Sequence, residues 1–256
     1  MSGQNERVLD QFTQQASTYA ALVKNQDSRP DPLVALLELQ PHHRLLDVGC
    51  GSGQFAIRAA PLVAEVLGVD LTPAMLVEAR EHARTSGVEN IRWVQADSVA
   101  LPVENCGFER VVSRSMFHHA ADPGATLTEM YRACAPGGRM FVSDLSPDPA
   151  KGPAFDAIEL LRDPSHQRAL TLEELRELGR DRGLAEIVLR SGATSLPLET
   201  VLATSFPPPG MLDHVRSLLE RDAARGTDIF GLRPEMRNEV IWVSYPTMIV
   251  GWEIPR

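Results

Sequence analysis

The chain has 256 residues, of which 43% are hydrophobic and 23% are charged, close to the proportions of an ordinary globular protein. These values exclude a disordered, collagen-like or coiled-coil chain. The formal net charge of −9 argues against a surface that attracts a nucleic-acid backbone or an anionic membrane.

The cysteines and the apolar segments indicate where the protein works. Cys50, Cys106 and Cys134 are widely spaced and form no metal-binding pattern, so we expect reduced thiols. The longest charge-free stretch near the end, residues 240–252, contains Pro246 and is shorter than the ~20 residues that a membrane helix needs. We therefore expect a soluble, cytoplasmic protein without a membrane partner.

The first 144 residues predict helices followed by alternating strands and helices. Apolar residues at helical spacing and a Pro-Asp-Pro run predict helices within residues 1–40. The strands predicted next are 44–48, 65–70, 91–96, 108–113 and 139–144. The helices predicted between them are 54–60, 73–87 and 122–134. Such alternation indicates βαβ units and a parallel, doubly wound sheet, whose ligands bind beyond the carboxyl ends of the strands.

The pattern changes after residue 144. Thr171 is expected to cap a helix that runs to about residue 181, and residues 185–190 predict a strand. A polar, proline-rich section with a helix at 212–225 precedes a last strand at 240–252. The expected fold is therefore α/β, with a mostly parallel sheet of seven strands.

A glycine loop joins the first strand of this sheet to the helix that follows. Residues 47–53 read Asp-Val-Gly-Cys-Gly-Ser-Gly, and Asp70 ends the next strand, where a carboxylate can accept both ribose hydroxyls. The dinucleotide pattern GxGxxG would need glycine where Gln54 stands. Asp47 would also repel a pyrophosphate, whereas it would attract a cationic amino-acid ligand. The loop therefore predicts a nucleoside cofactor, and disfavours a nicotinamide dehydrogenase.

Five motifs, in order along the chain, carry a family resemblance. They are the glycine loop at 47–53, Gly-Val-Asp-Leu-Thr at 68–72, Gln-Ala-Asp-Ser at 95–98, Phe-His-His at 117–119 and Ala-Pro-Gly-Gly at 135–138. Together they resemble the class I S-adenosylmethionine-dependent methyltransferases. More narrowly, they resemble the small-molecule branch that contains the ubiquinone/menaquinone C-methyltransferases. The resemblance covers roughly residues 5–190 and implies the Rossmann-like methyltransferase fold, with S-adenosyl-L-methionine as cofactor.

The resemblance also implies roles for individual residues. Asp47 and the backbone of Gly49, Gly51 and Gly53 would face the methionine part and the ribose. Asp70 would accept the ribose hydroxyls, and Leu71 would lie against the adenine. The adenine amino group would meet Asp97, with Ser98 beside it. Ser113 and Arg114 would lie near the methionine end, and Tyr19 would belong to a lid helix. These cofactor contacts are Tyr19, Asp47, Gly49, Gly51, Gly53, Asp70, Leu71, Asp97, Ser98, Ser113 and Arg114.

A base near the transferred methyl would help if the acceptor must lose a proton. His118 and His119 follow the fourth strand, and we favour His119 of the two. His166, in the long connection after the fifth strand, is the second catalytic candidate. Asp144 and Asp148 lack further clustered ligands, so we expect no metal.

The parts of this single domain have different expected tasks. We expect N-terminal lid helices in residues 1–40, a cofactor-binding core in 41–194, a substrate-capping insert in 195–238 and the final strand in 239–256. The family resemblance does not extend to the insert, and its mixed apolar composition suggests a pocket for a ring-containing or alkyl substrate.

The expected reaction is transfer of a methyl group to O, N or C of a small organic molecule, as in secondary or quinone-type metabolism. The alternative is a cyclase or rearrangement enzyme of the same fold, which binds S-adenosylmethionine without transferring methyl. Nucleic-acid methylation is disfavoured by the net charge and by the lack of a Pro-Pro-aromatic motif after the fourth strand. A small-molecule acceptor is therefore the expected partner, and a homodimer is left open.

Overall fold

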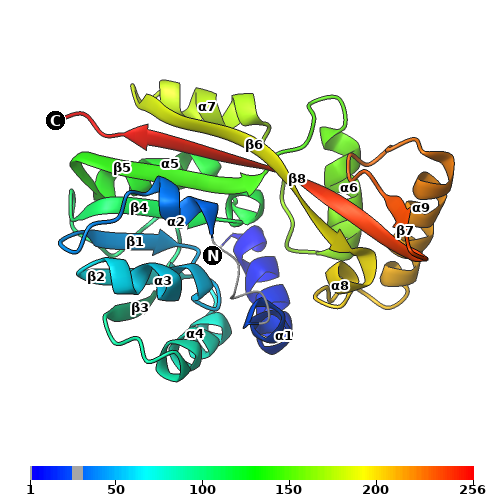
Figure 1. The fold of residues 1–256 in the computed structure, drawn as a ribbon, viewed down its shortest axis with the longest axis horizontal. Helices are drawn as coiled ribbons and strands as arrows, with labels where there is room; N and C mark the ends of the chain where they lie inside the picture. Colours follow the sequence, from blue (N-terminus) through cyan, green and yellow to red (C-terminus); the bar gives the residue numbers. More distant parts are fainter. Residues whose placement is uncertain (1, 25–30) are drawn as a thin grey trace.

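Figure 1 shows the fold in a computed structural model, which describes residues 2–24 and 31–256. The side chains of Tyr19 and of residues 22–24 also lie outside the description. In the described part of the chain, eight strands form one sheet in the order β3-β2-β1-β4-β5-β8-β6, with β7 paired to β8. The strands are β1 (Arg44–Val48), β2 (Glu65–Asp70), β3 (Ile91–Gln95), β4 (Phe108–Arg114), β5 (Cys134–Leu145), β6 (Ala185–Pro197), β7 (Glu235–Arg237) and β8 (Val240–Glu253).

The sheet confirms the predicted doubly wound α/β class. Strands β3, β2, β1, β4 and β5 are parallel, whereas β8 runs antiparallel to β5, to β6 and to β7. The short strand β7 adds to the seven that the sequence predicts. The helices are α1 (Gly3–Lys24), α2 (Pro32–Leu36), α3 (Gln54–Ala59), α4 (Pro73–Thr85), α5 (Pro123–Ala133), α6 (Gly152–Arg162), α7 (Leu172–Arg180), α8 (Leu198–Leu202) and α9 (Met211–Arg225), with short 3-10 turns at Ala60–Leu62 and Phe117–His119.

Local signals place several helix starts. Asp122 accepts a hydrogen bond from the backbone N–H of Ala125 and so caps α5, and Thr171 and Glu174 form a capping box on α7. Thr72 stands at the N-cap of α4, but its side chain makes no capping hydrogen bond. Pro73 at the first position of α4, with its preset φ, supports that start instead.

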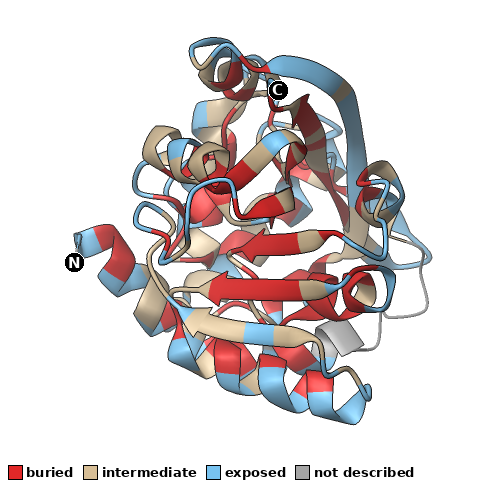
Figure 2. Cartoon of the chain, turned by 90° about the vertical axis from the view of Figure 1, so that its left-hand side faces the viewer, coloured by how far each residue is buried: buried red, intermediate tan, exposed pale blue. Residues whose placement is uncertain are grey.

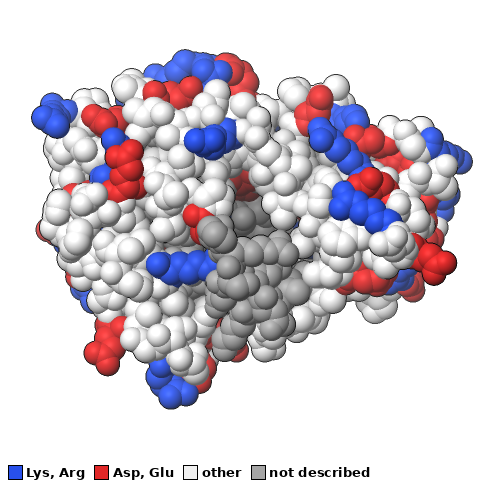
Figure 3. Space-filling view, in the orientation of Figure 1, with Lys and Arg blue, Asp and Glu red and all other residues white. Residues whose placement is uncertain are grey.

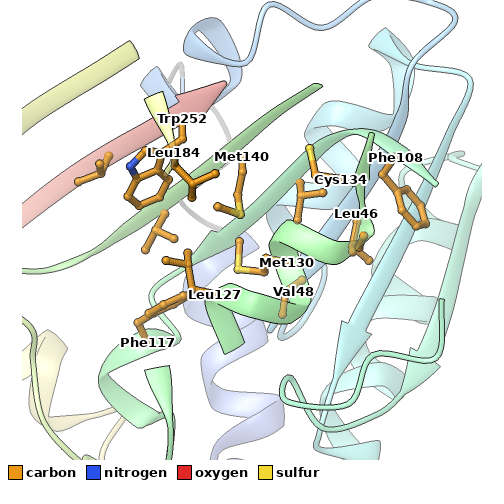
Figure 4. Close-up of a cluster of buried hydrophobic side chains, with 14 of the residues drawn as sticks. Leu46, Val48, Phe108, Phe117, Leu127, Met130, Cys134, Met140, Leu184 and Trp252 are labelled. Carbon is orange, nitrogen blue, oxygen red and sulfur yellow. The ribbon is translucent and has the colours of Figure 1, made fainter. Parts of the chain in front are cut away.

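Two apolar layers cover the two faces of the sheet because side chains alternate along the strands. In β1, Leu45 belongs to one layer, whereas Leu46 and Val48 belong to the other. Figure 4 shows the second layer, in which side chains of β1, β4 and β5 meet those of α5 and Trp252 of β8. Figure 2 shows the buried inner strands and the more exposed edge strand β3.

A second lobe lies to one side of this core (Figure 1). The long strands β6 and β8 run out of the core sheet, and α6, α8, α9 and β7 gather around their far ends. The lobe has its own apolar core, which includes Phe155, Leu202, Leu219 and Val243. Residues 195–238, expected as an insert, thus form only part of the lobe, because α6 and the far halves of β6 and β8 complete it.

Candidate active site

A cavity of about 400 Å³ opens at the carboxyl ends of the central strands. The loops after β1, β2, β3 and β4 form its walls, and one face of α1 lies against it. The predicted site residues that line it are Asp47, Gly49, Gly51, Asp70, Leu71, Asp97, Ser98, Arg114 and His119. The volume falls within the range of small-molecule pockets, ~300–1,000 Å³.

Three of the other predicted site residues do not line the cavity. Gly53 and Ser113 lie behind the residues that line the cavity, and the ring of His166 packs beside that of His118. Gly53 has φ +79° at the N-cap of α3, and the Trp93 ring packs where a β-carbon would project. The side chain of Tyr19 lies outside the described residues, so its predicted contact stays a prediction.

The glycine loop turns sharply because its residues adopt positive φ. The N–H groups of Gly49 and Cys50 both donate to Val69 O, which ties the loop to the end of β2. Gly51 has φ +52°, and a β-carbon on it would meet no atom within 4 Å. Since Gly51 lines the cavity, its missing side chain leaves room for a ligand to approach the backbone closely.

Asp47 holds an unfilled hydrogen-bonding position at this cavity. Its side chain is buried, and Oδ2 accepts no hydrogen bond. Burial raises the pKa of this carboxyl to about 7, and the guanidinium of Arg114 opposes the rise. Arg114 is itself held by Asp31, at 2.7 Å, and by Gln54 Oε1, at 2.9 Å. A cationic or hydrogen-donating ligand group would fill the open position on Asp47.

Asp70 and Asp97 stand at the ends of the next two strands. The N–H groups of Gly51 and Thr72 donate to the two oxygens of Asp70, each at 2.8 Å. These bonds fix the carboxylate in place and leave lone pairs on both oxygens for a ligand diol. Asp97 accepts from Asn5 Nδ2 at 2.5 Å, which draws the start of α1 over this end of the cavity.

The candidate catalytic histidines belong to one buried cluster. The ring of His118 lies 4.1 Å from that of His119 and 5.8 Å from that of His166, centroid to centroid. His119 lines the cavity beside Phe12, whereas His166 is shut behind the wall and bonds to Asp156. Burial, with the neighbouring His118, lowers the pKa of His119 to about 3. His119 therefore stays neutral, which suits a hydrogen-bond acceptor better than a strong base.

The sequence predicts a lid helix within residues 1–40, but two details of the site go beyond that prediction. Helix α1 supplies Asn5, Val8 and Phe12 to the cavity wall, and Gln4 Nε2 donates to the backbone oxygens of His119 and Ser165. The helical pattern of α1 was visible, but no local signal shows which strands a helix faces. Asp144, considered only as a metal ligand, instead pairs with His118 at 2.5 Å.

The chain is similar in sequence to known methyltransferases. A family model described as a methyltransferase domain matches residues 45–138. The uncharacterized methyltransferase YcgJ of Bacillus subtilis is 33% identical over 144 residues, which are 56% of this chain and 57% of YcgJ. The demethylmenaquinone methyltransferase of Thermus thermophilus is 39% identical over 108 residues, 41% of this chain and 49% of that protein. The uncharacterized protein YafE of Escherichia coli is 31% identical over 170 residues, 66% of this chain and 82% of YafE.

The fold is shared as well. The crystal structure of YcgJ matches with a TM-score of 0.79 and 24% identity, covering 88% of this chain and 97% of that one. In the sequence alignments, as distinct from this structural match, the chain spans about half the length of YcgJ and of the Thermus thermophilus enzyme. It belongs to the class I S-adenosylmethionine-dependent methyltransferases, and S-adenosylmethionine is the cofactor of that family. The predicted family, fold and cofactor are thereby confirmed.

Proposed function

We propose that this protein transfers the methyl group of S-adenosylmethionine to O, N or C of a small organic molecule. The observation that carries the proposal is the buried Asp47, whose Oδ2 faces no donor at the rim of the glycine loop. A buried carboxylate oxygen without a hydrogen bond is costly, and the amino group of the cofactor's methionine part would satisfy it.

The residues around the cavity fit the whole cofactor. Asp70 would accept the ribose hydroxyls, Asp97 would take the adenine amino group, and Arg114 would stand near the methionine end. When bound, the cofactor supplies a methyl group on a positively charged sulfur. The chain's contribution is to align the reacting groups and to exclude water, for which Phe12 and Val8 of α1 provide an apolar lid.

The acceptor proposed is a small molecule, and a quinone-type ring is one candidate. The named methyltransferases among the relatives include the demethylmenaquinone enzyme of Thermus thermophilus and a ubiquinone biosynthesis O-methyltransferase of Xanthomonas euvesicatoria. On the face drawn in Figure 3, basic side chains lie among acidic ones and do not gather into a large patch, which does not favour a nucleic-acid substrate. Among the described residues, no helix is long and apolar enough to cross a bilayer.

Two measurements test the proposal. Titration calorimetry should show binding of S-adenosylhomocysteine and none of NADH; the reverse result would remove it. Incubation with methyl-labelled S-adenosylmethionine and a panel of phenols, quinols and amines should then label a product. A converted product that carries no label would favour a cyclase that does not transfer methyl. One protein of similar fold, with a TM-score of 0.58 and 21% identity, is the [4+2]-cyclase SpnF.

A further inference from the structure

Each ring of the histidine cluster has one nitrogen held by a group that can only accept a hydrogen bond. His118 Nδ1 lies 2.5 Å from Asp144 Oδ1, and His166 Nε2 lies 2.7 Å from Asp156 Oδ1. His119 Nδ1 lies 3.0 Å from the backbone oxygen of Ser165. An ionised carboxylate and a carbonyl oxygen carry no proton to donate. The held nitrogen of each ring must therefore carry the hydrogen.

The surroundings of these acceptors support that assignment. Burial favours the neutral form of Asp144, but His118 and backbone N–H groups outweigh it and lower the pKa of Asp144 below its ordinary value. Ser165 Oγ gives its hydrogen to Asp163 Oδ1, at 2.5 Å, so it too can only accept from His119. The tautomer of His119 is thus set twice, by the carbonyl and by the hydroxyl of one residue.

The remaining nitrogen of each neutral ring is then a bare lone pair. Those of His118 and His119, both Nε2, receive no hydrogen bond from any residue in the described part of the chain. His166 Nδ1 is buried and has no partner. Leaving one buried acceptor unfilled costs ~1–3 kcal/mol. Of the three rings, only His119 lines the cavity, so its Nε2 is the lone pair that a ligand can reach.

We propose that the methyl acceptor is a compound with a hydroxyl or amine group, whose hydrogen is donated to Nε2 of His119. This inference rests on the proposed methyl transfer and names its substrate class. The acceptor's oxygen or nitrogen forms the new bond to the methyl carbon, and the methyl–sulfur bond breaks with its electron pair left on sulfur. The proton of the acceptor passes along this hydrogen bond to Nε2 of His119, and His119 then releases it to solvent and returns to its neutral form.

The neighbouring ring helps to keep His119 neutral. Burial alone would lower the pKa of His118, but Asp144, with smaller contributions from Glu159 and Asp163, raises it above its ordinary value. His118 is thus the ring best able to hold a positive charge, while its neighbour His119 stays neutral. A neutral His119 keeps its lone pair available to the acceptor.

Side-chain ¹⁵N NMR of the full chain, loaded with S-adenosylhomocysteine, tests the inference without turnover. From pH 6 to 9 we expect His119 to be neutral with a proton on Nδ1, and His166 to carry its proton on Nε2. A proton on Nε2 of His119 overturns the proposal. The ¹⁵N signals of His119 are assigned by their loss in His119→Asn, a variant that retains a hydrogen-bond donor toward Ser165. His214→Asn, on the exposed face of α9, is the control and should leave the His119 signals unchanged.

A matched pair of probes supplies the second readout. Phenol should shift the Nε2 signal of His119 at least twice as far as anisole does, since anisole has the same ring but no hydroxyl hydrogen. Equal shifts, or no shift with phenol, overturn the inference. Calorimetry on the same samples keeps the two hypotheses apart. Absence of S-adenosylhomocysteine binding counts against the proposed function, whereas binding with the wrong tautomer counts against the substrate class alone.

Discussion

The two lobes of this protein treat their buried polar groups differently. In the first lobe, Asp47 Oδ2 and Ser113 Oγ are buried without partners beside the cavity or behind its wall. In the second lobe, the buried Glu159 bonds to Arg162 at 2.6 Å and to the hydroxyl of Tyr245 at 2.9 Å. Arg162 continues to Ser205 Oγ at 2.8 Å. A polar network whose hydrogen bonds are all made stabilises the packing of its lobe. Unfilled hydrogen-bonding positions beside a cavity can instead be filled by a ligand.

The largest expected effect is a loss of folding stability, caused by a change in the second lobe, that leaves cofactor binding in the first lobe unchanged. Leu219→Ala would leave a cavity in the apolar core of the second lobe, where Leu219 is 2% exposed. Such truncations cost ~2–5 kcal/mol. We expect urea unfolding to show this loss, and calorimetry to show an S-adenosylhomocysteine affinity within twofold of the parent protein.

The control for Leu219 is Leu160→Ala in helix α6 of the same lobe. Leu160 is 53% exposed, so this change should alter the free energy of unfolding by less than ~0.5 kcal/mol. A tenfold loss of cofactor affinity in Leu219→Ala, with Leu160→Ala unchanged, would show that the second lobe helps to build the cofactor site.

The next effect concerns one carboxylate in each lobe. Asp70→Ala removes a group expected to bind the ribose, and hydrogen bonds to charged groups contribute ~1.5–3 kcal/mol. Calorimetry should therefore show a loss of S-adenosylhomocysteine affinity of roughly tenfold to a hundredfold. In the second lobe, Asp222→Ala removes a carboxylate that accepts from Thr227 and Ile229. It should lower stability but leave the affinity unchanged; equal losses in the two variants would contradict the assignment of Asp70.

The first lobe was more predictable from sequence than the second. Its strands are short apolar runs next to caps and glycines, so local patterns predict β1 to β4 and the glycine turn after β1 correctly. In the second lobe, β6 runs to Pro197, past the predicted end at residue 190. Residues 191–197 are mostly small or polar and follow no strand period. They are strand because they pair with β8, from Ser191 opposite Met248 to Pro197 opposite Trp242.

Helix α6 escaped prediction for a related reason. Its buried face mixes Phe155 and Ile158 with the charged Glu159, which looks like a solvent position in the sequence. In the folded chain Arg162 pairs with that charge, and the hydroxyl of Tyr245 donates a hydrogen bond to it. The histidine tautomers are equally invisible locally, because Asp144, Ser165 and Asp156 are brought to the rings by three different segments.

The open position on Asp47 predicts a pH dependence of about tenfold. Burial raises its pKa to about 7, with Asp70 and Asp31 adding to the rise and Arg114 opposing it. The carboxylate that would attract the ligand's ammonium group is therefore present mainly above pH 7. S-adenosylhomocysteine affinity should rise roughly tenfold from pH 6 to pH 8 and then level off.

Two observations check the role of Asp47. Asp47→Asn has no proton to lose, so its affinity should be nearly flat over this pH range. In the ligand-free protein, the stability of the fold changes with pH in the opposite direction to the ligand affinity. The pKa of Asp47 in the folded protein lies above its ordinary value of 3.8. Asp47 therefore contributes stability at low pH, and this contribution is lost as the pH rises toward 7. A pH-dependent affinity that persists in Asp47→Asn would assign the titration to another group.

The smallest effect compares two glycines within the first lobe. Gly51 and Gly87 have φ +52° and +67°, and a β-carbon on either would meet no atom within 4 Å. Substitution of either glycine by alanine should lower the free energy of unfolding by a similar ~1 kcal/mol, because of backbone strain. Only Gly51 lines the cavity, so only Gly51→Ala should also weaken S-adenosylhomocysteine binding, by about tenfold. Because the strain is matched, a difference in affinity at equal thermal stability would come from the methyl group occupying ligand space, and equal affinities would place the cofactor away from the glycine loop.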